Sequence, residues 1–358
     1  MTGDTFLVTK LLKIGLLGTG FVQETFHMPC YREIGVGNVV AVAGRTKDKT
    51  ESFARRWGIK KVYHGDNSFA QLCEDPEVEV VDIGLPNSLH MDAAICAAEN
   101  HKHIICEKPL GRNPTEAKKM LEAAERYGVI HCYAENQVFM PPITRVKEFI
   151  DRQAVGKVFW IRSREAHFGP HSPWFWDPKL AGGGVLMDMG CHSVEVARYL
   201  MDKKPIEAYG WGATLVHNTE AEDNSLILVR YEGGALGQSE NSWAAHGGLD
   251  LRFEIYGSEG VIFVDATRET GIKIFTVASE EAVDYVVEKA EAKRGWMFPI
   301  WREYEVYGYL AELQYFLSSI AEGNRPRESF NEGCIVNLIL EAGYESMRTK
   351  TWKTIQLA

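Results

Sequence analysis

The chain has 358 residues, a mass of 40.3 kDa and a formal net charge of -10. Its 45% hydrophobic and 25% charged residues exclude a disordered, collagen-like or coiled-coil chain, and the length predicts two domains. The acidic balance argues against nucleic acid as a partner. The sequence has no apolar run long enough to cross a membrane and no clear signal peptide at its start. The seven cysteines, an odd number without a CxxC pair, predict reduced thiols and a cytoplasmic location.

The first third of the chain alternates short apolar runs with helical patterns. After a short tail over 1–12, strands are predicted at 13–17, 39–43, 78–85 and 103–106. The helices between them are predicted to end near Arg32 and to cover 48–57, 91–99 and 114–127. Apolar strands that alternate with helices indicate parallel βαβ units. Residues 13–138 are therefore expected to form an α/β, doubly wound Rossmann domain.

The pattern changes after about Pro141. A helix is predicted over 143–152 and two more over 304–321 and 333–348, whereas period-two patterns predict strands at 157–166, 207–216, 225–231, 251–256 and 261–264. Residues 139–358 are expected to form an α/β domain with a large, mostly antiparallel, open-faced sheet for substrate binding and oligomerisation. Trp211, Tyr231 and Tyr256 are candidates for contacting a second copy in a homodimer or homotetramer.

A glycine turn joins the first predicted strand to a helix. Gly18 permits a tight turn, and Gly20 lets the backbone approach a pyrophosphate at the helix N-terminus, next to Phe21 and Val22. Gln23 stands where a third small residue usually allows close packing of helix and strand. The position of this turn predicts a dinucleotide site, although glycine turns without ligands are also common.

The end of the second strand bears on the choice of cofactor. An NAD site normally has an acidic residue here, whereas this chain has Gly44 followed by Arg45, Thr46 and Lys49. Cations in place of a carboxylate suit the 2′-phosphate of NADP, which is slightly favoured over NAD. Two alternatives stay open: Arg45 stacks on the adenine of either cofactor, or the segment is a solvated helix start.

Two further segments follow predicted parallel strands, where ligands of such sheets bind. The first is Leu85-Pro86-Asn87 with His90, and the second contains Glu107 and Lys108. We expect Asn87 near the nicotinamide and His90 at a helix start near the cofactor. Glu107 is expected either to hold ribose or to cap the strand end.

A glycine-rich segment far downstream leads into Asp188 and His192, which share one face of a helix at a spacing of four. The buried stripe of that helix is predicted to consist of Leu186, Met189, Val194, Ala197 and Leu200.

These motifs together resemble the glucose-fructose oxidoreductase / inositol dehydrogenase (Gfo/Idh/MocA) family of NAD(P)-dependent oxidoreductases. The resemblance rests on the order and spacing of the glycine turn, the Pro86–Asn87 segment with His90, the Glu107-Lys108-Pro109 triplet and the Asp188…His192 helix. It implies a Rossmann domain followed by an open-sheet α/β domain, dimers or tetramers, and a cis Pro109. It also implies a catalytic group of Lys108, Asp188 and His192. The chain departs from the family at Gln23 and at 134–138, where many members carry an arginine.

The residue types of this group suit the oxidation of a secondary alcohol. A neutral imidazole is matched to the hydroxyl proton near pH 7, so His192 is the candidate general acid/base, and Asp188 can orient the ring or the substrate. The Lys108 ammonium can stabilise the developing alkoxide. The ligand spacing suggests no metal. The alternative is that the Glu-Lys-Pro triplet arises by chance and that Asp188 and His192 form an ordinary surface pair.

The segment 166–177 is rich in aromatic and polar side chains that suit a sugar ring. The candidate substrate contacts are Asn136, His167, Trp174 and Trp176, with Trp243 and His246 as another pocket wall. The equally weighted alternative is an ordinary packing cluster.

The sequence thus predicts an NAD(P)-dependent oxidoreductase for a secondary hydroxyl or ketone of a sugar, inositol or glycoside. Two alternatives remain: an NAD-dependent glycosidase that oxidises C3 transiently and retains its cofactor, and a non-catalytic cofactor-binding regulatory protein.

Overall fold

The structure is a computed structural model that describes residues 11–35, 37–269, 272–277 and 295–357. These residues fall into two compact units, one within Met1–Glu135 and Tyr309–Cys334, the other within Asn136–Gly308 and Ile335–Ala358. The segment Tyr309–Cys334 thus belongs to the first unit, although the expected division at residue 138 assigned it to the second domain.

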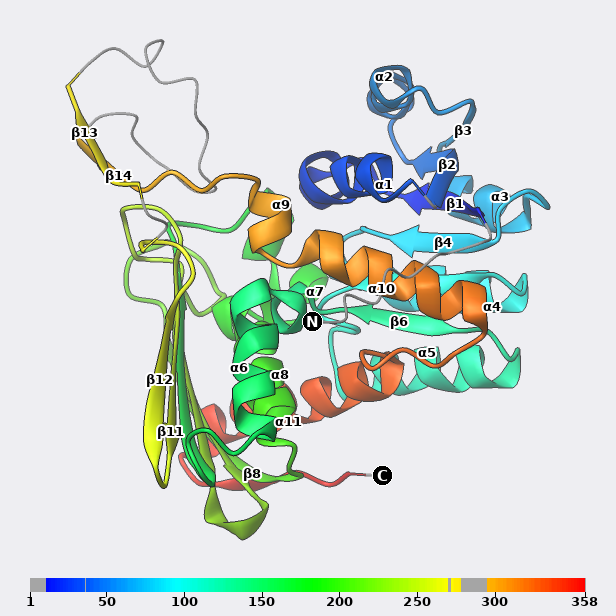
Figure 1. The fold of residues 1–358 in the computed structure, drawn as a ribbon. Helices are drawn as coiled ribbons and strands as arrows, with labels where there is room; N and C mark the ends of the chain where they lie inside the picture. The colour runs from blue at the N-terminus through cyan, green and yellow to red at the C-terminus, as the bar shows by residue number, and fades with distance from the viewer. Residues whose placement is uncertain (1–10, 36, 270–271, 278–294, 358) are drawn as a thin grey trace. The chain divides into compact units, whose positions relative to one another are not determined.

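The first unit contains a six-stranded parallel sheet (Figure 1). The strand order β3-β2-β1-β4-β5-β6 confirms the predicted doubly wound Rossmann arrangement. Its strands are β1 (Leu12–Leu17), β2 (Gly37–Gly44), β3 (Lys61–His64), β4 (Val80–Ile83), β5 (His103–Glu107) and β6 (His131–Ala134). The sequence analysis missed β3 and β6, which have only four residues each and include polar residues that break the apolar runs.

The helices of the first unit follow its strands in alternation, apart from segments late in the chain. The first starts as a π-helical segment, Gln23–His27, and continues as α1 (Met28–Ile34), which packs against α10 (Tyr309–Glu322). The Asn113 side chain accepts a bond from the Glu116 amide and caps α5. The remaining helices are α2 (Lys47–Trp57), α3 (Ser68–Glu74), a 3-10 turn (Asn87–Leu89), α4 (His90–Glu99) and α5 (Pro114–Arg126).

The second unit contains a seven-stranded sheet of order β12-β11-β7-β10-β9-β8-β15. Only β7 and β10 pair in parallel in it, so the expectation of a mostly antiparallel sheet is confirmed. The strands are β7 (Val158–Ala166), β8 (Pro205–Ala213), β9 (Asn224–Tyr231), β10 (Leu236–Ser242), β11 (Asp250–Gly257), β12 (Gly260–Asp265) and β15 (Lys353–Thr354). A separate ribbon pairs β13 (Ile274–Thr276) with β14 (Gly295–Met297).

The helical segments of the second unit position its candidate residues. The predicted helix over 304–321 is in fact two helices, α9 (Glu303–Val306) and α10, because Gly308 between them has a left-handed φ of 92°. Helix α11 (Phe330–Thr349) begins in the first unit and continues in the second. The other segments are the 3-10 turns Asn136–Phe139, Pro173–Trp176 and Glu232–Gly234, the π-helical Leu186–Gly190, α6 (Pro141–Asp151), α7 (Pro178–Ala181), α8 (Cys191–Met201) and α9 (Glu303–Val306).

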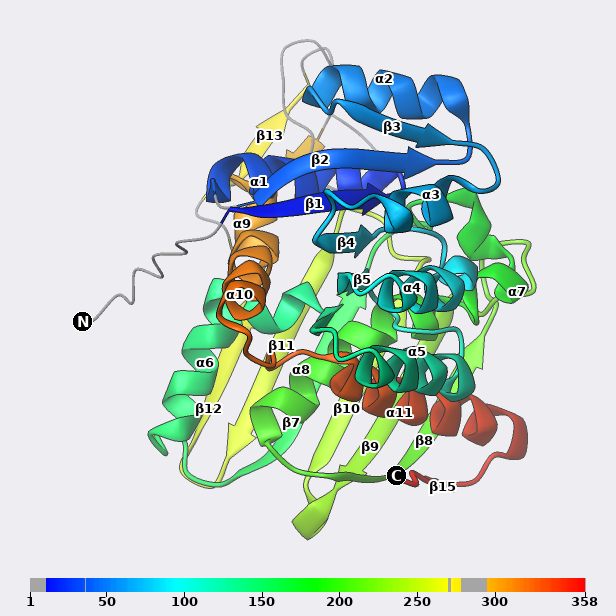
Figure 2. The same cartoon turned by 90° about the vertical axis from the view of Figure 1, so that its right-hand side faces the viewer.

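One face of the seven-stranded sheet is covered by α8 and α11, as Figure 2 shows. The predicted apolar stripe of the helix that carries Asp188 and His192 is buried at all five positions, which confirms that prediction. No described helix has the length and apolar character that crossing a bilayer requires.

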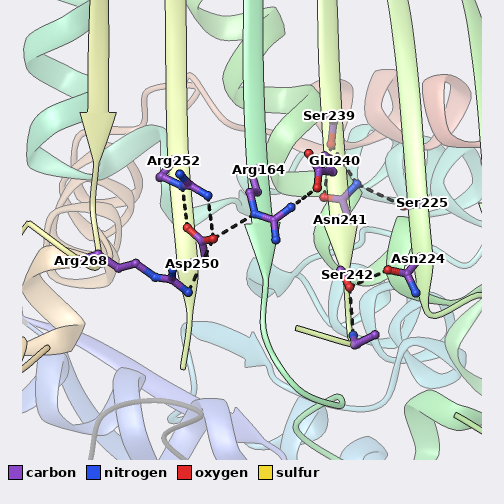
Figure 3. Close-up of polar contacts among 11 residues, drawn as sticks. Arg164, Asn224, Ser225, Ser239, Glu240, Asn241, Ser242, Asp250, Arg252 and Arg268 are labelled. Atoms are coloured by element: carbon purple, nitrogen blue, oxygen red, sulfur yellow. Dashed lines mark hydrogen bonds and ion pairs between the residues drawn. The ribbon is translucent and has the colours of Figure 1, made fainter. Parts of the chain in front are cut away.

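The opposite face of this sheet carries interleaved charges (Figure 3). Arg164 lies between Glu240 and Asp250, and Asp250 also pairs with Arg252 and Arg268. Trp211 is 43% exposed, whereas Tyr231 is only 1% exposed. The prediction that Tyr231 is available to a second copy is therefore wrong, since its place in the alternation of β9 turns it into the core.

Candidate active site

The turn after β1 has the geometry of a pyrophosphate cradle. Gly18 has a φ of 107°, and a Cβ at this position would lie 2.4 Å from the carbonyl oxygen of Gly84. Its amide donates to the Ala43 carbonyl at 2.9 Å. A Cβ on Gly20 would meet no atom within 4 Å, so the start of the helix faces open space beside the exposed Phe21 and the half-buried Val22. A tight turn followed by an open helix start fits a dinucleotide phosphate.

The structure accounts for Gln23, which stands where a third small residue was expected. Its side chain is fully buried, and its amide donates to Asp82 Oδ1 at 3.0 Å. A Cβ on Gly84 would lie 2.6 Å from Gln23 Nε2. The close approach of helix and strand is therefore made possible by a glycine after β4 rather than by one in the turn.

The segment after β2 exposes the predicted cations. Arg45, Thr46 and Lys49 are all exposed. A Cβ on Gly44 would lie 2.5 Å from the Thr50 hydroxyl, so no acidic side chain fits at Gly44 without displacing Thr50. The local packing thus explains why the carboxylate that is typical of NAD sites is missing here.

His90 connects the two loops that follow β4 and β5. Its Nδ1 lies 3.0 Å from the Pro109 carbonyl oxygen and its Nε2 lies 2.9 Å from that of Leu85. Burial lowers the pKa of His90, although the carbonyl oxygens of Leu85 and Pro109 oppose this shift. The structure therefore brings both predicted loop segments together, with Asn87 buried and Leu85 and Pro86 half-buried.

The Glu107-Lys108-Pro109 triplet ends β5, and the peptide bond between Lys108 and Pro109 is cis, as the resemblance implied. Glu107 Oε2 accepts a bond from the Lys108 backbone amide at 3.2 Å, and Glu107 Oε1 lies 3.0 Å from His27 Nε2. The sequence analysis did not identify His27 or its second partner Asp82. The sequence did contain a signal for this pair: Asp82 is an acidic residue within the apolar strand β4, and a buried carboxylate needs a polar partner.

In the second unit, Asp188 lies in the π-helical segment Leu186–Gly190 and His192 lies in the first turn of α8. Both side chains are buried. Asp188 Oδ2 accepts a bond from the indole nitrogen of Trp243 at 3.1 Å. Because a buried carboxylate needs donors, Trp243 contributes to fixing Asp188 in place.

Glu222 and Tyr344 anchor the glycine loop that precedes this helix. Glu222 accepts bonds from the amides of Gly184 and Leu186, and the Tyr344 hydroxyl accepts one from Met187. The Tyr344 hydroxyl also donates to Glu222 at 2.7 Å. Burial raises the pKa of Glu222, although these bonds oppose the shift. The sequence analysis missed both residues, which lie far from Gly184 in the chain.

The aromatic segment packs around Trp243. Trp176 meets this indole edge-on, with ring centroids 5.2 Å apart. Trp174 stacks on Phe175 at 3.8 Å, and the His167 ring lies 5.2 Å from that of His171. Trp243, predicted to form a separate pocket wall, thus belongs to the same cluster as Trp176.

His246 stacks on Phe168 at 4.0 Å, within the same aromatic segment. The Asn136 amide donates to the Tyr307 carbonyl at 2.7 Å. The candidate residues therefore form two sets. The glycine turn, the Arg45 segment and the loops after β4 and β5 are in the first unit, whereas Asn136, the aromatic segment, Asp188 and His192 are in the second.

Comparisons with known proteins agree with this division. Residues 12–135 match a family model described as "Oxidoreductase family, NAD-binding Rossmann fold", and residues 143–263 match the GFO/IDH/MocA C-terminal domain. Levoglucosan dehydrogenase of Pseudarthrobacter phenanthrenivorans is 30% identical, over 95% of this chain and 97% of that protein. Myo-inositol 2-dehydrogenase of Thermotoga maritima is 28% identical, again over 95% of this chain and 97% of that protein. The crystal structure of GenD2 from gentamicin A biosynthesis, in complex with NAD, superposes with a TM-score of 0.90 at 25% identity, covering 98% of this chain and 97% of that one.

Proposed function

Because the chain belongs to the Gfo/Idh/MocA family of NAD-binding oxidoreductases, we propose that it transfers hydride between a nicotinamide cofactor and a carbohydrate-like substrate. The reacting group is a secondary hydroxyl or ketone of a sugar, inositol or glycoside. Two relatives are named levoglucosan dehydrogenase and myo-inositol 2-dehydrogenase, which supports this substrate class.

The observation that carries the substrate class is the link between Asp188 and the aromatic segment. Trp243 donates to Asp188 and packs edge-on against Trp176, so the two features belong to one cluster. Sugar rings present C–H faces that pack on aromatic rings, and their hydroxyls bind polar groups nearby. We assign His167, Trp174, Trp176 and Asn136 to substrate contacts on this basis.

Three side chains carry the chemistry in this proposal. A bound nicotinamide would supply the acceptor for the hydride that leaves the alcohol carbon. His192 takes the hydroxyl proton as general base and returns it in the reverse direction, while Asp188 orients the ring or the substrate hydroxyl. The Lys108 ammonium stabilises the negative charge that develops on the substrate oxygen.

The described residues of the first unit fit a dinucleotide. Gly18 and Gly20 form a turn with room for phosphate, and the loops after β4 and β5 are held together by His90. The residues of the first unit that would hold the cofactor are Gly18, Gly20, Phe21, Val22, Arg45, Thr46, Lys49, Leu85, Pro86, Asn87, His90, Glu107 and Lys108. We also assign Asn136, which belongs to the second unit, to the cofactor.

We propose a slight preference for NADP over NAD, supported by exposed Arg45, Thr46 and Lys49 beside a Gly44 that leaves no space for a carboxylate. Arg45→Asp should shift the ratio of the two dissociation constants toward NAD. A stronger preference for NADP in this variant would overturn the assignment.

The open face of the seven-stranded sheet supports assembly into a homodimer or homotetramer. Its alternating arginines and carboxylates, together with exposed Trp211, offer both charge signs to a second copy of the same surface. Sedimentation as a 40.3 kDa monomer at working concentration would contradict this assembly.

We also propose a reducing, cytoplasmic location, since all seven cysteines are free thiols.

A reduction assay tests the function directly. NAD and NADP are each offered with a panel of sugars, inositols and glycosides, and the reduced cofactor is followed by absorbance. Steady accumulation of reduced cofactor on a polyol supports a dehydrogenase. Release of sugar from a glycoside without net cofactor turnover would indicate the glycosidase, and cofactor binding without either reaction would indicate the regulatory protein.

A further inference from the structure

A polar cluster lies buried beneath the Lys108 segment of the first unit. His27 Nδ1 lies 2.7 Å from Asp82 Oδ2, and His27 Nε2 lies 3.0 Å from Glu107 Oε1. The Tyr31 hydroxyl and the Gln23 amide also donate to Asp82, at 2.6 Å and 3.0 Å. The side chains of His27 and Asp82 are fully buried. Burying such a cluster costs free energy unless its charges are matched.

The contacts of His27 bear on its protonation state. Both ring nitrogens face carboxylate oxygens, and a neutral imidazole can donate from only one nitrogen. Bonds from both nitrogens to carboxylate oxygens therefore favour the imidazolium. Burial by itself would lower the pKa of His27, but Asp82 and Glu107 outweigh it and raise that pKa well above its usual value.

The same cluster reaches the catalytic lysine through a single carboxylate. Glu107 uses one oxygen to bind His27 and the other to accept the backbone amide of Lys108. A continuous path of bonds therefore runs from Asp82 on β4 through His27 on the first helix to the residue that begins the loop after β5. If the ring of His27 moves, the Glu107 carboxylate must move with it or the bond between them must break. The same carboxylate accepts the bond from the Lys108 backbone amide.

The surroundings of His27 are acidic, which makes its charge important. Glu312 on α10 is fully buried, and neither of its carboxylate oxygens has a hydrogen-bond partner among the described residues. Burial, followed by the charge of Glu107, raises the pKa of Glu312 well above its usual value, which favours the neutral acid. Titratable groups from several elements surround the cluster: Asp82, Glu107, Glu135, Glu312, Tyr31, Cys30, Cys106 and Cys132. The Tyr309 ring on α10 also lies close, 5.9 Å from the ring of His27.

We propose that His27 is a positioning residue for the reaction: bound to Asp82 and Glu107 at once, it fixes the Glu107 carboxylate and thereby the placement of Lys108. This inference rests on the proposed role of Lys108 in stabilising the alkoxide. His27 itself touches neither substrate nor cofactor in this scheme. The cluster acts as a rigid support under the loop, because the ring and both carboxylates have no freedom to reorient once their donors and acceptors are matched.

The first test is a double-mutant cycle on the full-length protein. His27→Gln should lower kcat on the order of tenfold to a hundredfold, since small misplacements of a catalytic group have effects of that size, while KM changes little. His27→Gln should add nothing to the loss in a Lys108→Ala background. Equal losses of kcat in both backgrounds would overturn the proposal, because a merely structural role lowers activity in each.

His131→Gln is the matched control. His131 is also a buried histidine of the first unit, its Nδ1 accepts the Phe330 amide at 3.1 Å, and burial lowers its pKa to about 4. We expect this variant to keep the wild-type kcat. If His27→Gln does not fold, Glu107→Gln tests the same proposal. This substitution weakens the bond between His27 and Glu107 and should reproduce the fall in kcat.

A second readout does not depend on any substrate. The lysines are reductively methylated with isotope-labelled methyl groups, and the Lys108 signal is assigned by its loss in Lys108→Arg. In His27→Gln and Glu107→Gln this signal should shift or broaden, whereas in His131→Gln it should stay in place. An unchanged Lys108 signal in a folded His27→Gln protein would overturn the proposal. If the wild type oxidises no polyol but the signal shifts as expected, the proposed function fails while the positioning role stands.

Discussion

The Lys108 loop and the Asp188 helix are held in place by different kinds of contacts. Beneath Lys108, the carboxyl groups of Asp82 and Glu107 both face the buried imidazole ring of His27, whose pKa they raise. Around Asp188, the donors are neutral: the Trp243 indole binds Asp188, while backbone amides and the Tyr344 hydroxyl bind Glu222. The charged arrangement fixes its partners strongly but depends on pH and fails when one member is removed. Removing one bond from the neutral arrangement should lower the free energy of unfolding by less, and the structural change should stay closer to the substituted residue.

Each of the two regions also contains a π-helical segment, and His27 or Asp188 lies in it. His27 ends the segment Gln23–His27, and Asp188 lies within Leu186–Gly190. Single-turn π segments recur at functional sites because the extra residue redirects side chains that a regular helix would place elsewhere. The two regions therefore share a way of aiming a side chain and differ in how they hold it.

The largest effect on stability is expected from His27→Gln. Removing the cation leaves buried carboxylates unmatched, which should lower the free energy of unfolding by about 3–5 kcal/mol. Because the pKa of His27 is raised in the folded state, its contribution is complete below the unfolded value of 6.5 and is lost as the pH rises through the folded value.

Urea unfolding across pH checks this prediction. The difference between wild type and His27→Gln should be widest on the acidic side of neutrality and should narrow as the solution becomes alkaline. A difference that grows with rising pH would contradict the assignment of an imidazolium.

Lys108→Ala should have the largest effect on catalysis. Loss of one group that stabilises an oxyanion lowers kcat on the order of a hundredfold to a thousandfold, and the affinity for the cofactor should change much less. Steady-state kinetics and a cofactor titration separate the two quantities. Lys119→Ala, which changes an exposed lysine of α5, serves as the control. Full activity in Lys108→Ala would refute the proposed mechanism.

Glu312→Gln should stabilise the protein, in contrast to the first two substitutions. The folded pKa of Glu312 is raised, so keeping the acid neutral costs stability above its unfolded value of 4.5. The gain from Gln should approach about 1.4 kcal/mol for each pH unit above that value until the folded pKa is passed. Unfolding at neutral and at acidic pH measures it, and a gain that persists unchanged below the unfolded pKa would contradict this origin.

The sequence predicted the elements whose signals are local and missed the contacts that depend on folding. The strand-to-helix turn at Gly18, the Glu107-Lys108-Pro109 triplet and the spacing of Asp188 and His192 can be read in short windows. His27 and Glu107 are 80 positions apart and Gly184 and Tyr344 are 160 apart, so only the parallel sheet order and the course of α11 bring them together. Tyr231 was misjudged because its face in β9 depends on the register of that strand.

The smallest effect is expected from Trp243→Phe, which tests the neutral arrangement. Phe keeps most of the apolar contact with Trp176 but removes the donor to Asp188, so the buried carboxylate loses one bond. Stability should fall by about 1–3 kcal/mol, and kcat should fall severalfold because Asp188 gains freedom. Trp57→Phe is the matched control, since its buried indole nitrogen has no hydrogen-bond partner among the described residues. If both substitutions change kcat equally, the indole bond does not position Asp188. If only Trp243→Phe lowers kcat, the neutral bond from Trp243 positions Asp188, just as we propose that the ionic cluster positions Lys108.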